Sequence, residues 1–288
     1  MKYINTSKTR KKNGLCPAEV RKFRREIYSF FKTSGRSFPW RATTDPYRIL
    51  VSEIMLQQTQ VSRVEKKYDQ FIKLFPDIDT LASSPLAEIL KAWNGLGYSR
   101  RAVALKRIAD RIVREYEGKI PDSRDILLTF PSIGKATSCS ILAFAFDKPT
   151  IFIETNIRAV FISFFFPGTS KVDDSRIIPL IEATIDGKHP RKWYYALMDY
   201  GADLKKKYPL LLRRSSLYKK QSPFHGSDRE IRSKVLRLAV VKKRISHTRL
   251  LQSIECDHAR LQKILIGLEK DGLIESKNGF FKIKRSTD

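Results

Sequence analysis

The chain has 288 residues, 42% of them hydrophobic and 30% charged, which is enough for one large or two modest domains with buried cores. Its 56 Lys and Arg against 30 Asp and Glu give a formal net charge of +26, so a polyanion such as nucleic acid is the expected partner. No apolar run approaches the ~20 residues that cross a bilayer, and no signal peptide is visible. These features argue against a membrane or secreted protein and favour one in the cytoplasm, at the nucleoid, or in the nucleus.

Three cysteines, Cys16, Cys139 and Cys256, are far apart, and their spacing matches neither a disulfide framework nor a zinc site. We therefore expect no metal. The first residues are rich in Lys and Arg without an apolar segment behind them, which predicts a basic arm. The predicted divisions are the arm at 1–15, a helical domain at 16–221 and a smaller domain at 222–288.

The first helix is predicted over 17–31, where apolar residues recur at helical spacing. A loop then leads to Phe38-Pro39-Trp40-Arg41. A turn fixed by proline and carrying Trp40 and Arg41 can form one wall of a nucleobase pocket, because both side chains stack on flat rings. A tryptophan that fills the core is equally common, so both interpretations stay open.

Glu53 is the candidate catalytic acid. Asp45 and Pro46 mark a helix start, and the residues three and four positions from Glu53 are mostly apolar. A carboxyl on an apolar helix face loses solvent, which raises its pKa and keeps it protonated near neutral pH, as a general acid requires. The alternative is an acid at the edge of the core that is paired with an arginine.

Two glycine-containing turns offer backbone and charge for nucleic acid. Gly95-Leu96-Gly97-Tyr98 permits close backbone approach, and Arg100 and Arg101 behind it can contact phosphates. Ile133-Gly134-Lys135 lies between two helical segments, so the free N–H groups of a helix start, together with Lys135, can hold a phosphate. Tight interhelical turns with solvated basic ends are the alternative for both.

Glu154 is the second candidate acid. Thr155 or Asn156 can cap an apolar helix over 157–165, which places Glu154 at the helix N-terminus, where the dipole favours the ionised carboxylate. Glu53 and Glu154 are then expected in opposite protonation states, the pairing that glycosidic-bond cleavage uses. Taken alone, Glu154 is also a common helix-terminus residue with a role only in stability.

Five motifs between about Cys16 and Tyr208 resemble, in the same order, those of the helix-hairpin-helix (HhH-GPD) DNA glycosylases, and most closely the MutY-type adenine glycosylases. They are Phe38–Arg41, Ser52–Val61, Gly95–Tyr98, the hairpin at Gly134, and Glu154–Asn156. The run Met55–Gln60 is the discriminating motif, because endonuclease III relatives that act on oxidised pyrimidines differ there. The resemblance implies an all-α, two-lobed glycosylase domain.

What the resemblance implies is excision of adenine mispaired with 8-oxoguanine or guanine, from a nucleotide flipped out of double-stranded DNA during base excision repair. Glu53 matches the acid that protonates adenine N7, and Asn156 lies beside the second acid. The positions that match DNA contacts of the family are Leu56, Gln57 and Gln58 in the base stack, Tyr98 against the opposing lesion, and Ile133, Gly134 and Lys135 in the phosphate-holding hairpin.

Four departures from the family's pattern matter. Glu154 stands where the family carries Asp, and Ser132 replaces the first glycine of the hairpin. Ala136 occupies the position of the nucleophilic lysine of bifunctional relatives, which predicts a monofunctional enzyme, although Lys135 could give weak lyase activity. Where many relatives bind an iron–sulfur cluster, residues 203–221 contain no cysteine and many basic residues, so we expect no cluster and no other cofactor.

The C-terminal region predicts a winged helix-turn-helix with a β-hairpin, since three helical segments precede two short strands around Asn278-Gly279. Its third helix can enter a major groove, with Arg260 or Lys263 reaching DNA. A module that only stiffens the fold or binds a protein is the alternative. The predicted helix caps are Asp228, Ser246 and Asp257.

The leading hypothesis is a monomeric, monofunctional adenine glycosylase with Glu53 as acid and Glu154 as electrostatic stabiliser or transient nucleophile. A glycosylase of the same fold that acts on uracil or thymine opposite guanine is the second hypothesis. The third is a catalytically silent winged-helix DNA-binding protein, against which the two carboxylates and the glutamine run argue.

Overall fold

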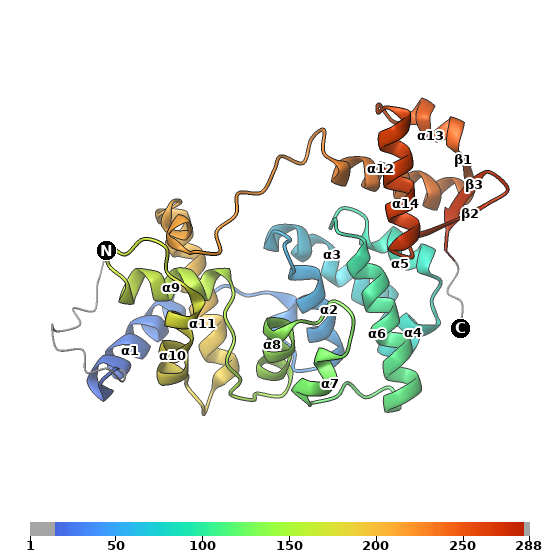
Figure 1. The fold of residues 1–288 in the computed structure, drawn as a ribbon. Helices are drawn as coiled ribbons and strands as arrows, with labels where there is room; N and C mark the ends of the chain where they lie inside the picture. Colours follow the sequence, from blue (N-terminus) through green and yellow to red (C-terminus); the bar gives the residue numbers. More distant parts are fainter. Residues whose placement is uncertain (1–14, 285–288) are drawn as a thin grey trace. The chain divides into compact units, whose positions relative to one another are not determined.

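The computed structural model describes residues 15–284, so all but the last residue of the predicted basic arm lies outside the described residues. Helices dominate, and a small sheet follows near the C-terminal end, which confirms the predicted fold class (Figure 1). The chain forms two compact units that share the sequence in alternation. The first unit comprises the chain up to Pro46, Asp122–Asp125 and Gly134–Lys220; the second comprises Tyr47–Pro121, Ile126–Ile133 and the chain from Gln221.

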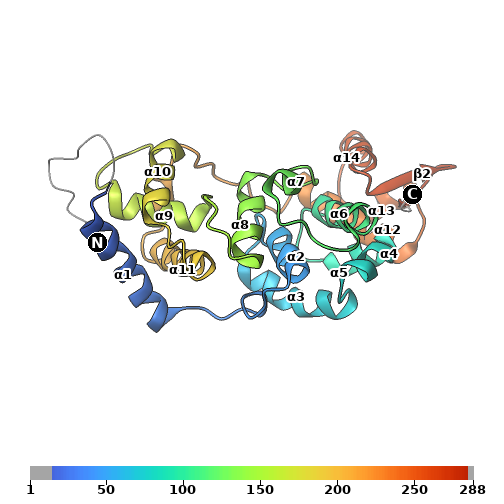
Figure 2. The same cartoon turned by 90° about the horizontal axis from the view of Figure 1, so that it is seen from below.

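The first unit is organised around α9 and α11, which pack against each other, with α1 and α10 beside them (Figures 1 and 2). The ring of Phe23 in α1 lies edge-on to Phe161 and Phe165 of α9 and to Trp193 of α11, with centroid distances of 5.0 to 5.7 Å. The run Phe161–Phe166 therefore fills a core. The elements are α1 (Pro17–Ser34), the 3-10 turn η1 (Pro39–Arg41), α8 (Lys135–Ala145), α9 (Thr155–Phe165), α10 (Asp174–Thr184), α11 (Pro190–Lys207) and the 3-10 turn η2 (Leu211–Arg214).

The second unit is built on α6, whose apolar face packs on α4 and α5. Helix α12 of the C-terminal region also packs on α5. Helix α7 (Arg124–Leu128) spans the division between the two units. The other helices are α2 (Pro46–Leu56), α3 (Val61–Leu74), α4 (Ile78–Ser83), α5 (Leu86–Trp93), α6 (Arg100–Tyr116), α12 (Asp228–Lys242), α13 (His247–Ser253) and α14 (His258–Lys270).

The C-terminal region has three helices and an antiparallel sheet in the strand order β1-β3-β2. The winged helix-turn-helix stays a prediction. The strands are β1 (Ile245–Ser246), β2 (Ile274–Lys277) and β3 (Phe280–Ile283). Asn278 and Gly279 form a two-residue turn with φ of 52° and 72°, the backbone that a hairpin with right-handed strand twist prefers. Strand β1 was not predicted, since two residues carry no strand signal.

Two of the three predicted caps in this region are confirmed. The side chains of Ser246 and Asp257 accept hydrogen bonds from the backbone N–H groups of Arg249 and Arg260. The expectation for Asp228 is wrong, because Ser227 occupies the cap position and Asp228 is the first helical residue. An acid there still favours the helix through its dipole.

Across residues 15–284, no helix is both long enough and apolar enough to cross a membrane.

Candidate functional site

Glu53 lies where the sequence predicts it, in the last turns of a helix that begins at Pro46. Its neighbours Ser52 and Ile54 are buried, whereas Glu53 itself is half-buried. The carboxyl therefore leaves α2 at the edge of the core, where one part of the side chain is fixed by packing and another part is accessible. The predicted protonation of Glu53 near neutral pH stays a prediction.

Arg101 holds the end of the helix that carries Glu53. It is only 6% exposed, and its Nη1 donates to the carbonyl oxygens of Ile54, Met55 and Gln57 at 2.8, 2.9 and 2.5 Å. These carbonyls belong to the last turn of α2, which has no helical partners for them. A cation at this end also complements the helix dipole. The expectation that Arg101 contacts phosphates is wrong, because these bonds and its burial hold it inside; Arg100 is exposed instead.

The same guanidinium fixes the loop before α6. Its Nη2 donates to Leu96 O and Gly97 O at 3.3 and 3.1 Å and to Thr59 Oγ1 at 2.9 Å. The carbon of the guanidinium lies 5.4 Å from the centroid of the Tyr98 ring. Burial lowers the pKa of Arg101 to about 10, which still leaves it charged at neutral pH. One side chain thus joins the segment after Glu53 to the Tyr98 loop.

The predicted base-stack residues follow α2 directly. Gln58 is exposed and adopts a φ of 54°, in the left-handed region. Gln57 Nε2 donates to Ser132 O at 2.9 Å, and Leu56 is half-buried. The backbone reversal at Gln58 therefore presents that side chain outward, while Gln57 is directed to the hairpin.

The predicted hairpin is present between α7 and α8. Ser132 has a φ of 62°, a conformation that suits glycine and strains other residues, which explains why the family's pattern has glycine there. Gly134 occupies the N-cap position of α8, and Lys135 is its exposed first residue. The Ile133 side chain is only 5% exposed, so only its backbone is placed to meet a ligand.

Glu154 is the N-cap residue of α9 itself, so the expectation that Thr155 or Asn156 caps this helix is wrong. Glu154 Oε1 accepts from the N–H groups of Asn156 and Ile157 at 2.8 and 2.9 Å, and Oε2 accepts from Asn156 Nδ2 at 3.1 Å. Glutamate is long enough to fold back onto its own helix. These three hydrogen bonds fix the orientation of the carboxylate.

Asn156 also lies against α11. A Cβ on Gly201 would be 2.2 Å from Asn156 O, so only glycine allows the two helices to approach this closely. The amide Oδ1 of Asn156 is buried and has no hydrogen-bond partner within the described part of the chain. One turn after Gly201, the half-buried Lys205 feels the charge of Glu154; burial lowers the pKa of Lys205 and the glutamate opposes that shift.

Trp40 is 4% exposed and stacks on Phe38, with centroids 4.9 Å apart. Arg41 donates Nη1 and Nη2 to the two carboxylate oxygens of Asp199 at 2.8 and 2.9 Å, and Arg36 binds the same carboxylate. These contacts give both motif residues a structural role in the first unit. Their role in a base pocket stays a prediction.

Of the two predicted DNA contacts on α14, Lys263 is exposed. The guanidinium of Arg260 is bound to Asp228 Oδ1 at 2.8 Å and to Gly226 O at 2.7 Å. Arg260 must leave these partners, or share them, to contact a phosphate. Its predicted DNA contact is untested.

Comparison with known proteins identifies the fold. A family model described as "HhH-GPD superfamily base excision DNA repair protein" matches residues 51–183. A thymine/uracil-DNA glycosylase of Methanothermobacter thermautotrophicus is 33% identical over 180 residues, which cover 61% of this chain and 81% of that protein. The chain belongs to the HhH-GPD superfamily.

Other superfamily members share comparable similarity. The adenine DNA glycosylase of Buchnera aphidicola subsp. Baizongia pistaciae is 37% identical over 62% of this chain and 52% of its own length. This chain thus spans about half of that relative. The solved structure of a thermostable thymine-DNA glycosylase is 31% identical with a TM-score of 0.57, covering 64% of this chain and 86% of that one. A DNA complex of endonuclease III, 18% identical with a TM-score of 0.55, supports the fold alone.

The segment after α11 does not fit the iron–sulfur cluster that many superfamily members carry there. Residues 203–221 contain no cysteine, so thiolate ligands are missing from that segment. Backbone pairing and arginine hydrogen bonds hold this segment in place instead. Val172 and Ser215 pair in a parallel bridge, and Arg214 donates Nε to Thr169 O at 2.9 Å and Nη2 to Phe166 O. Arg214, one of the basic residues of this segment, is thus bound to backbone carbonyls.

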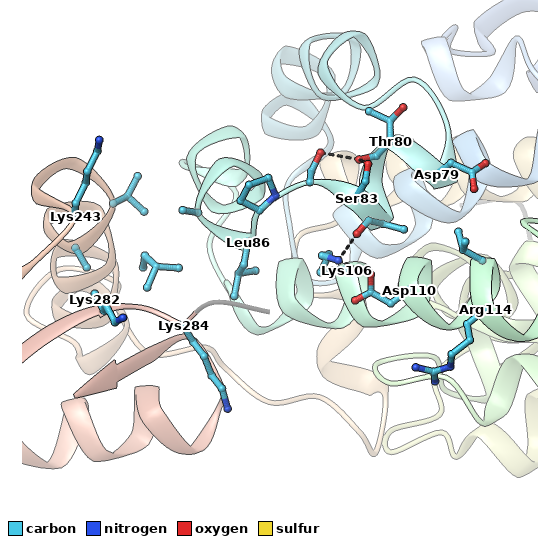
Figure 3. A pocket seen from close by; sticks show the side chains of 18 residues that line it. Asp79, Thr80, Ser83, Leu86, Lys106, Asp110, Arg114, Lys243, Lys282 and Lys284 are labelled. Carbon is cyan, nitrogen blue, oxygen red and sulfur yellow. Dashed lines mark hydrogen bonds and ion pairs between the residues drawn. The ribbon is translucent and has the colours of Figure 1, made fainter. Parts of the chain in front are cut away.

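A cavity of about 1350 Å³ lies in the second unit, away from the predicted site residues, none of which is among its described lining (Figure 3). One wall comes from α4, α5 and α6 and includes the Lys106–Asp110 ion pair. The other wall carries Lys243, Lys282 and Lys284. Its mixed charge does not by itself define a ligand.

Arg101, Asp199 and Lys205 are the residues that sequence reasoning missed. For Arg101 a signal existed, since it precedes the buried positions Leu105, Ile108 and Ile112 at helical spacing. No comparable local signal distinguishes Asp199 or Lys205.

Proposed function

We propose that this protein is a monofunctional DNA glycosylase of base excision repair that removes adenine mispaired with 8-oxoguanine or guanine in double-stranded DNA. The similarity to adenine DNA glycosylases of Buchnera and Mycolicibacterium smegmatis, at 37% and 36% identity, supports the choice of base. The observation that carries the proposal is Glu53, half-buried near the end of α2 and five positions before the exposed Gln58. An acid beside residues that enter the base stack is what base removal requires.

In the proposed reaction Glu53 protonates the flipped adenine at N7, so the base leaves neutral and the N-glycosidic bond breaks with less charge separation. The sugar then carries positive charge. Glu154, whose carboxylate accepts hydrogen bonds from three N–H groups, stabilises that charge or bonds transiently to the sugar before water replaces it. The amide nitrogen of Asn156 donates to Glu154 Oε2 and so helps to orient that carboxylate.

The hairpin supports binding to the duplex. Gly134 leaves the first N–H groups of α8 uncovered, and the exposed Lys135 adds a positive charge beside them, an arrangement that binds phosphate. Ala136 stands where bifunctional relatives carry the nucleophilic lysine, so the product is an abasic site with an intact backbone. We further propose that the protein acts as a monomer, on DNA of the nucleoid or nucleus.

A second candidate function is removal of thymine or uracil opposite guanine. The 33% identity to the thymine/uracil-DNA glycosylase of Methanothermobacter thermautotrophicus, over 81% of that protein, favours it. The two functions share the backbone scaffold and differ in the pocket, so substrate tests separate them.

The deciding experiment measures single-turnover base release from matched duplexes. The duplexes carry adenine opposite 8-oxoguanine, adenine opposite guanine, and uracil or thymine opposite guanine, and each reaction is analysed with and without hot alkali. We expect adenine release whose detection as strand scission needs alkali. Release of only uracil or thymine establishes the second function. Tight binding without release from any duplex supports a silent DNA-binding protein.

Glu53→Gln is the matched control, because it keeps the shape of the side chain and removes the acid. We expect base release to fall by a factor of at least about 100, while duplex affinity measured by fluorescence anisotropy stays within about twofold. Parallel loss of release and affinity contradicts the role of Glu53 as acid.

A further inference from the structure

The C-terminal region is attached to the second unit beside the Tyr98 loop. Arg100 at the start of α6 lies 3.9 Å from the carboxylate of Asp271, and Arg232 of α12 binds the same carboxylate. Arg107 of α6 packs against Gly272, where a Cβ would come within 2.8 Å of its guanidinium. Three arginines from two helices thus converge on the turn after α14.

A second set of contacts reaches Tyr98 itself. Gln221 Nε2 donates to the Tyr98 hydroxyl at 2.6 Å, and Arg229 Nη1 lies 3.4 Å from the same oxygen. Arg229 Nη2 also binds Ser222 O at 2.6 Å, which ties the start of α12 to the segment that carries Gln221. The hydroxyl is therefore held by two donors from the C-terminal region.

The backbone of Tyr98 needs such support. Its φ is 47°, a left-handed conformation that is strained for a bulky residue and persists only where neighbouring contacts enforce it. Arg101 contributes from the ring face, at 5.4 Å from the centroid. Gln221 and Arg229 contribute from the hydroxyl end. The ring is held at both ends.

This held ring belongs to the same surface as the residues expected in the base stack. Arg101 binds the carbonyls of both Gln57 and Gly97, so the Gln57–Gln58 segment and the Tyr98 loop are joined through one guanidinium. Gln58, Tyr98 and Arg229 therefore lie on connected parts of one unit.

We propose that Gln221 and Arg229 are positioning residues that fix the Tyr98 ring, so that the C-terminal region sets how strongly the enzyme discriminates between bases opposite the excised one. The inference rests on the proposed glycosylase function. A ring fixed in one orientation packs against one opposing base better than another, whereas a mobile ring accommodates several. The C-terminal region then acts on specificity through Tyr98 without contacting the excised base.

The test compares Gln221→Ala, Arg229→Ala and Tyr98→Phe, singly and combined. Tyr98→Phe removes only the shared hydroxyl. Arg237→Ala is the matched control for charge, because Arg237 is exposed on the same helix α12. The readout is the ratio of single-turnover rates for adenine opposite 8-oxoguanine and adenine opposite guanine, which is insensitive to a general loss of folded protein.

We expect the rate ratio to fall about three- to tenfold in Gln221→Ala combined with Arg229→Ala, and equally in Tyr98→Phe, as the loss of hydrogen bonds to one hydroxyl predicts. Adding Gln221→Ala and Arg229→Ala to Tyr98→Phe should cause no further change, since both act on the oxygen already removed. Arg237→Ala should leave the ratio unaltered. An unchanged ratio, or effects that add fully, overturns the inference.

Failure of the proposed function gives a different pattern. If the wild type releases thymine or uracil, the ratio is measured for that base opposite guanine and opposite adenine. If it releases no base, the ratio of dissociation constants for the same two adenine duplexes replaces the rates. A wild type that binds both duplexes equally, or variants that keep its binding preference, overturns the inference in that case.

Discussion

Two arginines, one in each compact unit, stabilise segments that bear candidate site residues, and they do so in opposite ways. Arg101 in the second unit donates to neutral oxygens at the end of α2 and in the Tyr98 loop. Arg41 in the first unit faces Asp199, which is 2% exposed, and shares it with Arg36. Around Arg101 the positive charge is balanced by the dipoles of neutral oxygens. Around Arg41 it is balanced by the negative charge of Asp199.

The difference predicts distinct responses to pH. Burial alone would raise the pKa of Asp199, but hydrogen bonds and charge from Arg41, with help from Arg36, hold it below its ordinary value of 3.8. Across residues 15–284, the atoms shown to accept from Arg101 are carbonyl and hydroxyl oxygens, which do not gain a proton in this pH range. Lowering the pH should therefore weaken the Arg41–Asp199 ion pair in the first unit. It should leave the Arg101 hydrogen bonds in the second unit unchanged.

The largest expected effect is that of Arg101→Ala, which leaves the final carbonyls of α2 and the Tyr98 loop without their donor. We expect the free energy of unfolding to fall by about 4 kcal/mol in urea titration. Arg101→Lys should recover little, because one ammonium cannot span acceptors arranged for a planar guanidinium. Arg100→Ala is the control, with a loss of at most about 0.5 kcal/mol. Equal losses at the two positions would contradict the capping role.

Asp199→Asn should cost about 3 kcal/mol at pH 7, since it leaves Arg41 buried without its counter-charge. The carboxylate's stabilisation is complete above its ordinary pKa of 3.8 and is lost as the pH falls through the lower value of the folded state. Urea titrations from pH 7 to pH 2 should show the difference from wild type shrinking below about pH 4. A constant difference over this range would refute the assigned ion pair.

Glu154→Ala tests the N-terminus of α9, which is capped by the residue directly before the helix. Loss of the N-cap should lower the free energy of unfolding by about 1 kcal/mol, and base release should fall by about a hundredfold or more. Glu154→Asp separates the two roles, because aspartate caps well and keeps the charge. We expect it to retain both stability and activity; a stable but inactive Asp variant would show that the extra methylene is needed for reach.

Ser132→Gly should give the smallest change. Glycine adopts the observed φ of 62° without strain but has more freedom in the unfolded chain. The net result should be a gain of about 0.5 kcal/mol in urea titration. Ser132→Ala keeps the strain and serves as control. A loss of stability in the glycine variant would show that the serine backbone is not strained.

Features fixed by neighbours in sequence could be predicted, and those fixed by distant partners could not. The Asn278-Gly279 turn and the caps Ser246 and Asp257 depend on residues within four positions, and their chemistry is visible in the sequence. Arg101 and Asp199 depend on partners more than forty residues away. In the sequence, Arg101 is one of two adjacent arginines, and only burial separates their roles.

In the candidate site, too, the features fixed by sequence neighbours could be predicted and those fixed by distant partners could not. Glu53 and Glu154 were located from helix starts and apolar spacing, and the family's motifs indicated their roles. The sequence did not show that Glu154 folds back onto Asn156 and Ile157, because the shorter Thr155 and Asn156 are the commoner caps. Nor could it show that Gln221 reaches Tyr98, since this contact spans more than a hundred residues.

The segment after α11 is held in place by contacts that involve no metal ligand. Its Val172–Ser215 bridge and the Arg214 contacts are made of backbone amides and one guanidinium, groups that neither lose electrons nor bind iron. These contacts therefore form without iron, and an iron chelator should leave them unchanged.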